Sequence, residues 1–334
     1  GLLASKFWPE ANQNQANASI RVAVLPFDNL SSNPSDAYIA RSIPEMVLNR
    51  LSSVRGLTVI ARDTALLSPV SSGPLKNAGQ SLQAAFIVKG SVQRTGATLR
   101  VTCFVVDTAN ETRLWSERFD WPVDRLYALQ DRIADRVATS LAARTRGIGE
   151  LAPAVADTRN ADAYLAYLKG KALLGRFTVA QTDAAAQQFE RAVNLDPDFA
   201  AALVALFDAR MQAADLRRED LDQTRSRYQP LLDKALRIAP NSGEALFAKA
   251  MWVSLPQVQK AALFRRATEL DPSNSGGLIA YAQFLGGSLH GGAYEGIGDG
   301  NVTRDGADGE ERKRLLARVA SIDPLNSRAQ FVAI

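Results

Sequence analysis

The clearest alternation of apolar and polar positions lies between residues 86 and 119, in three runs rich in β-branched and aromatic residues. Turn-forming residues at 95–97 and 107–111 separate the runs. A period of two predicts strands, and short turns between them predict an antiparallel meander. One face of the middle run carries Leu99, Val101, Cys103 and Val105. Apolar atoms also occur on the other face, and we expect the sheet to be covered on one side.

Residues 20–27 form a nearly continuous apolar run and predict a strand in a covered sheet. Helical spacing between residues 39 and 51 predicts a helix, and residues 57–62 predict a second strand. This order favours a parallel strand–helix–strand crossover. The turn-rich residues 28–35 follow the first strand, where open α/β sheets usually bind ligands.

The predicted helix has a local complication. Ser42 and Glu45 are spaced as a capping box, and Pro44 fits a first helical turn. We therefore expect a short turn of helix followed by a longer helix. Downstream, residues 68–79 predict a loop, 80–85 a short helix and 126–144 a long helix lying across the sheet.

The second half of the chain is predicted to be helical and repetitive. A large apolar residue is followed three positions later by a small or β-branched one, and five further by proline. The four occurrences are Phe189-Ala192-Pro197, Leu232-Ala235-Pro240, Phe264-Ala267-Pro272 and Leu316-Val319-Pro324. Such a pattern predicts stacked helix pairs, with proline ending the second helix of each pair.

These patterns divide the 334 residues into an α/β domain (20–145), a linker (146–160) and an all-α solenoid (161–334). The solenoid carries a Gly-rich insertion at 286–309. Residues 1–19 are expected to be the end of a membrane anchor and a tether, because Lys6 and Trp8 resemble the interfacial end of a spanning helix. The alternative is a frayed start of a fragment.

Composition changes this picture little. The chain is 46% apolar and 22% charged with a net charge of +4, which gives no reason to expect direct nucleic-acid binding. The single cysteine, Cys103, excludes an intrachain disulfide and is expected to be a buried core residue, with a reactive thiol as the alternative.

Two families can be named from these strings. The second half resembles tetratricopeptide repeats through AVNLDPDF, ALRIAPNS, ATELDPSN and VASIDPLN. The first half resembles the TolB-like, FlgO-like domain through IRVAVLPFDNLSSNPSDAYIA, LTVIARDT, YALQDRIADRVATSL and the meander. Residues 42–44 depart from the latter pattern, which usually has glycine followed by a polar residue. The resemblance implies the extracytoplasmic region of a bacterial membrane-bound regulator, with a nucleotide-cyclase or CadC-like winged-helix DNA-binding output domain.

Catalytic or metal chemistry has little support in the residues. Residues 296–300 lack the context of a phosphate loop, and residues 299–305 lack the glycine and bidentate glutamate of a calcium loop. His290 is the only histidine and has no orienting acid nearby in sequence. Asp107, Glu117 and Asp120 are expected to be solvated strand or turn residues. We therefore expect no enzyme, no cofactor and no metal in this chain.

The expected function is sensory protein interaction in signal transduction, on the periplasmic side of the inner membrane and anchored by a helix before residue 9. Tyr164, Tyr167 and Lys171 have the spacing to line the groove of the first repeat and bind a protein or peptide, although packing within the repeat is the alternative for the tyrosines. A small ligand could occupy the inter-domain cleft, and oligomers are possible. The alternative function is a cell-envelope assembly scaffold that binds partners through the same groove.

Overall fold

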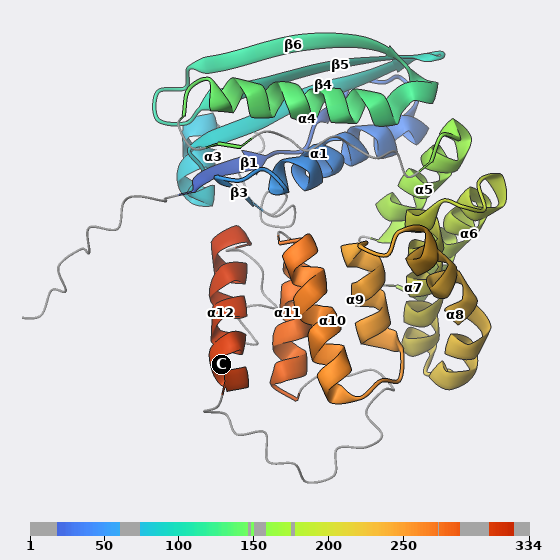
Figure 1. Cartoon of the computed structure of the whole chain (residues 1–334). Helices are drawn as coiled ribbons and strands as arrows, with labels where there is room; N and C mark the ends of the chain where they lie inside the picture. Colours follow the sequence, from blue (N-terminus) through green and yellow to red (C-terminus); the bar gives the residue numbers. More distant parts are fainter. Residues whose placement is uncertain are drawn as a thin grey trace, which may run out of the picture.

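The computed structural model describes residues 19–60, 74–145, 148–149, 158–174, 178–272, 274–287 and 307–323. It consists of an α/β domain and an arc of helices that runs beneath it (Figure 1). Residues 1–18 of the expected anchor and tether (1–19), His290 and most of the Gly-rich insertion (286–309) lie outside the described residues.

One mixed sheet forms the centre of the α/β domain. Its strands are β1 (Ile20–Val24), β2 (Asp28–Asn29), β3 (Leu57–Ile60), β4 (Phe86–Thr95), β5 (Thr98–Asp107) and β6 (Arg113–Pro122). The order is β3-β1-β4-β5-β6, with β2 beside β4. β1 is parallel to β3 and β4, whereas β4, β5 and β6 form the antiparallel meander. The predicted mixed sheet and meander are therefore confirmed.

Helices cover one face of the meander. The helical elements of this domain are η2 (Pro34–Asp36), α1 (Ala37–Ser52), α3 (Leu75–Leu82), η4 (Val123–Arg125) and α4 (Leu126–Ala142). The fully buried β5 residues Leu99, Val101, Cys103 and Val105 belong to one core with α1 and α4. On the opposite face, Arg100 is exposed and Thr102 and Phe104 are half-buried. The expectation of one covered face is confirmed, and α3 packs on the opposite face, beside β1.

Two local predictions were wrong. α1 is one continuous helix from Ala37 to Ser52 that contains Pro44, and the Ser42 hydroxyl bonds to the Ile39 carbonyl at 3.0 Å instead of capping a second helix. α3 starts at Leu75, inside the predicted loop. Gly79 had suggested a loop, but it lies within α3 and lets the helix pack closely on Thr108. Any larger residue would clash there, since its Cβ would lie 2.4 Å from Cβ of Thr108.

The second half contains eight described helices that pack in sequence order. They are α5 (Ala161–Leu173), α6 (Val179–Leu195), α7 (Ala200–Arg217), α8 (Leu221–Ile238), α9 (Gly243–Trp252), α10 (Gln257–Leu270), α11 (Ser275–Leu285) and α12 (Ala307–Ile322). Five begin at side-chain caps, which are Asn160, Thr178, Asp220, Ser242 and Asn274. Such caps satisfy amide groups that the first turn leaves unpaired.

The repeated apolar and proline positions have the expected structural roles. The large residues Phe189, Leu232 and Phe264 are completely buried. The small residue three positions after each of them is an alanine that is also buried. α6, α8 and α10 each end two residues before a proline. In the last occurrence Val319 is fully buried, whereas Leu316 is only half-buried.

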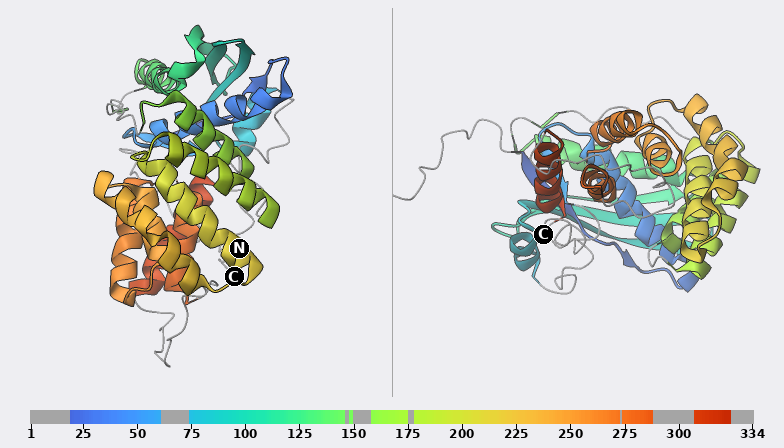
Figure 2. Two further views of the ribbon diagram at one scale, coloured as in Figure 1. Left: turned by 90° about the vertical axis from the view of Figure 1, so that its right-hand side faces the viewer. Right: turned by 90° about the horizontal axis from the view of Figure 1, so that it is seen from below.

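Both ends of the helical arc contact the α/β domain. At one end, α5 packs against α1 and η4, and a single buried cluster runs from the sheet through α5, α6 and α7. Tyr164 of α5 donates a hydrogen bond to Gln130 of α4 inside this cluster. At the other end, α12 lies beside β3, and Arg21 donates to the Ser321 hydroxyl at 3.1 Å (Figures 1 and 2).

Candidate functional site

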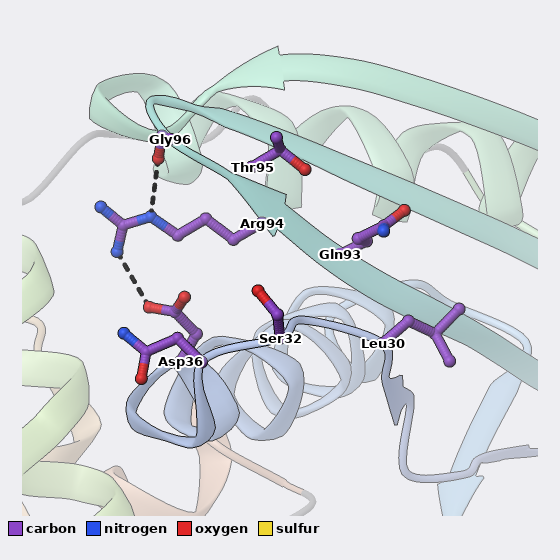
Figure 3. A pocket seen from close by; sticks show the side chains of 8 residues that line it. Leu30, Ser32, Asp36, Gln93, Arg94, Thr95 and Gly96 are labelled. Carbon is purple, nitrogen blue, oxygen red and sulfur yellow. Dashed lines mark hydrogen bonds and ion pairs between the residues drawn. The ribbon is translucent and has the colours of Figure 1, made fainter.

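A polar pocket lies at the carboxyl ends of β2 and β4, between the chain that follows β2 and the β4–β5 turn (Figure 3). It has a volume of about 480 Å³, and its lining residues are Leu30, Ser32, Asn33, Asp36, Gln93, Arg94, Thr95 and Gly96. The Asn33 side chain accepts the amide of Ser35 at 3.0 Å and so begins η2. Gly96 has a φ of +59°, which glycine adopts easily in a tight turn.

Arg94 organises this pocket. Its guanidinium lies 3.0 Å from the Asp36 carboxylate and donates through Nε to the Gly96 carbonyl at 3.0 Å. The Arg94 amide also bonds to the Ser31 hydroxyl at 2.9 Å. The Asp36 side chain is only 11% exposed, so this ion pair is screened less than one on an open surface. The ion pair therefore fixes the loop after β1 to the end of β4.

The remaining lining groups offer hydrogen bonds rather than reactive chemistry. Hydroxyl and amide side chains of Ser32, Asn33, Gln93 and Thr95 surround the opening, and Leu30 is 57% exposed beside them. No histidine or cysteine is among the lining residues. The arrangement is suited to holding a polar group. Sequence analysis had indicated this loop as a ligand site through its position after the first strand, but it had not identified Arg94.

The structure buries both tyrosines predicted to line the repeat groove and leaves Lys171 partly exposed. Tyr164 and Tyr167 are 5% and 7% exposed and stack at a centroid distance of 6.3 Å inside the buried cluster. Each ring also packs against Phe199, at 6.4 and 5.1 Å. These contacts correspond to the packing alternative for the tyrosines. The Lys171 side chain is 30% exposed and pairs with Glu244 of α9.

Lys171 belongs to a polar surface shared by α5, α7 and α9, which we call the inner face and define by Lys171, Asp208, Glu244 and Trp252. Lys171 Nζ lies 3.5 Å from the Glu244 carboxylate. The nearby Tyr167 hydroxyl and the Glu244 carboxylate together raise the pKa of Lys171. The ion pair therefore links the first and third of these helices.

Asp208 is the inner-face residue that sequence reasoning missed. The Trp252 indole donates to one of its carboxylate oxygens at 2.6 Å, and the Gln212 amide donates to the other at 2.6 Å. Burial raises the pKa of Asp208, although these two hydrogen bonds and Lys171 oppose the shift. Trp252 is 44 residues away in sequence, so no local motif announces the pair.

A second pocket, of about 530 Å³, lies among α10, α11 and α12. Beside it, Arg265 and Glu311 form two hydrogen bonds of 3.2 and 3.0 Å. Burial, followed by the negative charge of Glu311, raises the pKa of Tyr281 to about 12. The charged residues that line this pocket all come from α12, where Glu310 and Glu311 form ordinary surface ion pairs, and we assign the pocket no chemistry.

Other candidate chemistry is weak in the described residues. Cys103 is a fully buried free cysteine, as expected, and burial raises the pKa of its thiol to about 12. Asp120 pairs with Arg100 at 2.7 Å, and Glu117 pairs with Arg136 of α4 at 2.8 Å on the covered face. In the ranges described, no three His, Cys, Asp or Glu side chains are placed to hold a metal ion. None of the described helices has the length and apolar character needed to cross a bilayer.

Fold and surfaces together define a mixed-sheet α/β domain joined to an array of helices, with polar surfaces suited to binding. No family model matches the sequence. The chain is 27% identical to "Putative adenylate cyclase 3" of Rhizobium meliloti (strain 1021) over 192 residues, which are 58% of this chain. The match covers 33% of that protein, so the chain spans about a third of its length.

Two solved structures show a limited likeness to part of the chain. TolB from Acinetobacter baumannii is 19% identical with a TM-score of 0.25, covering 38% of this chain and 30% of TolB. Lipoprotein GNA1162 from Neisseria meningitidis is 16% identical with a TM-score of 0.28, covering 36% of this chain and 98% of the lipoprotein. At these scores neither structure carries an argument about function.

Proposed function

We propose that this chain is a non-enzymatic sensory and protein-interaction region of a membrane-anchored bacterial signalling protein. The observation that carries the proposal is the continuous buried cluster that joins the sheet to α5, α6 and α7 directly beside the inner face. A ligand that rearranged the inner face would also displace helices packed on α1 and α4. Similarity to a protein named as a putative adenylate cyclase, over a third of that protein's length, supports a place beside an output domain.

In this proposal the helix pairs are tetratricopeptide repeats, and their inner face binds a protein or peptide through Lys171, Glu244 and Asp208. The region lies on the periplasmic side of the inner membrane, anchored by a helix before residue 9. Its output domain is a cytoplasmic cyclase or a DNA-binding domain. Ligand binding changes the output only by as much as the ligand's affinity differs between two arrangements of the region.

The test uses the complete gene product in a bacterial host that lacks its own adenylate cyclase, with intracellular cyclic nucleotide as the readout. Lys171→Glu places a negative charge beside Glu244 and Asp208 and should change the output severalfold at equal protein abundance. Arg266→Glu is the matched control, since Arg266 is 52% exposed and its ion pair, with Glu269, lies within α10. Equal output from both variants and the parent would show that the inner face has no sensing role.

The competing function, an envelope assembly scaffold, would use the same face without an output. Reading the gene upstream of residue 1 separates the two. A cyclase or winged-helix domain there supports signalling, whereas a lipoprotein signal with a cysteine supports assembly. Absence of turnover in a broad hydrolase screen of the purified chain would agree with a non-enzymatic role, and turnover that survives repurification would contradict it.

A further inference from the structure

β6 forms one edge of the sheet and runs along the outer margin of the α/β domain (Figure 1). It pairs with β5 on one side, and no strand in the described ranges pairs with its other side. The strand is ten residues long, whereas most strands have about five or six. Long edge strands expose backbone groups that readily pair with another chain. The edge is therefore a candidate interaction surface.

The ladder between β5 and β6 shows which backbone groups point outward. The Val123 amide bonds to the Ala97 carbonyl at 2.8 Å, which continues the ladder beyond the strand ends. Residues of an antiparallel pair alternate between facing the partner strand and facing away. Because Val123 faces β5, every second residue before it, starting with Pro122, faces away from β5. The N–H and C=O groups of Asp120, Arg118 and Ser116 therefore point outward. Pro122 has no N–H and ends this row.

Among centres at Glu117, Arg118 and Phe119, charge favours Phe119 for pairing β6 with β6 of a second copy. In an antiparallel pair related by a two-fold axis perpendicular to the sheet, residues at equal distances from the centre lie opposite each other. A centre at Arg118 or Glu117 would place like charges opposite each other, which is destabilising. A centre at Phe119 instead places Arg118 opposite Asp120 of the partner subunit. By the two-fold symmetry, it also places Asp120 opposite Arg118 of the partner subunit.

The side chains on this edge are compatible with that register. The Arg118 side chain is 64% exposed and lies 3.9 Å from Asp120 of its own strand, which is long for an ion pair. Asp120 pairs more closely with Arg100 of β5, at 2.7 Å, but its side chain is still 43% exposed and can accept a second cation. Glu117 is an inward-pointing charge of the kind that usually protects an edge from pairing. Here Arg136 of α4 neutralises it at 2.8 Å. Its charge therefore does not oppose the approach of a second strand.

We propose that two copies of this chain associate through antiparallel β6–β6 pairing centred on Phe119, so that their sheets form one continuous sheet. The partner is a second copy because the edge is complementary in charge to itself in this register. In a signalling protein, such pairing would hold two output domains together. The proposal does not depend on the inner face.

Sedimentation equilibrium of the whole chain tests the association. Arg118→Asp and Asp120→Arg each place like charges opposite each other twice and should weaken dimerisation roughly tenfold or more. The combined Arg100→Asp/Arg118→Asp/Asp120→Arg variant exchanges the charges, keeps an opposite charge on β5 facing residue 120, and should recover most of the affinity. Arg266→Asp, on the surface of α10, should have no effect. Circular dichroism of each variant establishes that the fold is retained.

A spin label tests the register independently. Ser116→Cys is labelled selectively because Cys103 is fully buried. A centre at Phe119 separates the two residues 116 by about 20 Å, whereas a centre at Arg118 gives about 14 Å. A monomer at all concentrations up to about 1 mM, or a dimer indifferent to both charge reversals, overturns the proposal. Failure of the combined variant to recover affinity, or a separation near the shorter value, overturns the Phe119 register.

Discussion

Gly170 of α5 is the position where packing between consecutive helices can be tested most directly. A Cβ at this position would lie 2.4, 2.7 and 2.9 Å from three carbons of the Phe189 ring on α6. Phe189 is fully buried and packs against Tyr167 at a centroid distance of 5.8 Å, so the ring has little room to move. The Gly170→Ala variant should therefore force α5 and α6 apart.

The expected effect is a balance of two opposing contributions. Overpacking a core by one methyl group costs about 1–3 kcal/mol. Replacing a mid-helix glycine by alanine returns about 1 kcal/mol through helix propensity. The net loss in the free energy of unfolding should therefore be about 0–2 kcal/mol. Gly276→Ala in α11 is the matched control because the nearest atom to its Cβ is 3.5 Å away. It should be neutral or stabilising by up to about 1 kcal/mol.

Urea unfolding followed by circular dichroism gives these values for the whole chain. Because one substitution alone mixes packing with propensity, a double-mutant cycle with Phe189→Leu isolates the contact. The smaller side chain should relieve the clash, so Gly170→Ala should be less harmful in that background by about 1 kcal/mol or more. Additive effects of Gly170→Ala and Phe189→Leu would refute the assigned contact.

Three further predictions concern buried polar groups. Tyr164→Phe leaves the side-chain oxygen of Gln130 without its buried donor and should lower the free energy of unfolding by about 1–3 kcal/mol in urea titrations. An unchanged unfolding midpoint would contradict this. The Cys103 thiol, whose pKa burial raises to about 12, should react with a disulfide reagent at pH 8 only after unfolding, and rapid labelling of the native chain would show exposure. Burial raises the pKa of Asp208, so this group favours folding most below its unfolded pKa, and that contribution is lost as pH rises through its folded pKa. Relative to Asp208→Asn, stability should therefore fall as pH rises above about 4, the usual aspartate pKa. A difference in stability that does not change with pH would argue against burial of this carboxylate.

Local periodicity predicted the elements whose stability depends on one buried face. Alternation with period two identified β4, β5 and β6, and their covered face follows from the residues in that alternation. The errors in the helices have a different origin. Pro44 and Gly79 are usual interruptions of a helix, but tertiary packing retains both inside helices, and Gly79 is needed for contact with Thr108. Propensity alone does not include such long-range contacts.

The candidate sites were less predictable because they depend on how separate elements meet. The position of residues 28–35 after the first strand indicated one pocket. Its central residue, Arg94, was not predictable because it lies 58 residues after its partner Asp36 in the sequence. Helical spacing placed Lys171 on the same stripe as Tyr164 and Tyr167, although only Lys171 is on the inner face. Its partner Glu244 is 73 residues away and is brought there by the curvature of the array.

The return of α12 to β3 gives the array a fixed number of units. In an open solenoid each repeat contacts only its neighbours, so a unit can be gained or lost with little effect on the others. Here the Arg21–Ser321 contact joins residues 300 positions apart and requires the intervening helices to span one set distance. Inserting or deleting a helix pair would move α12 away from β3 and break that contact.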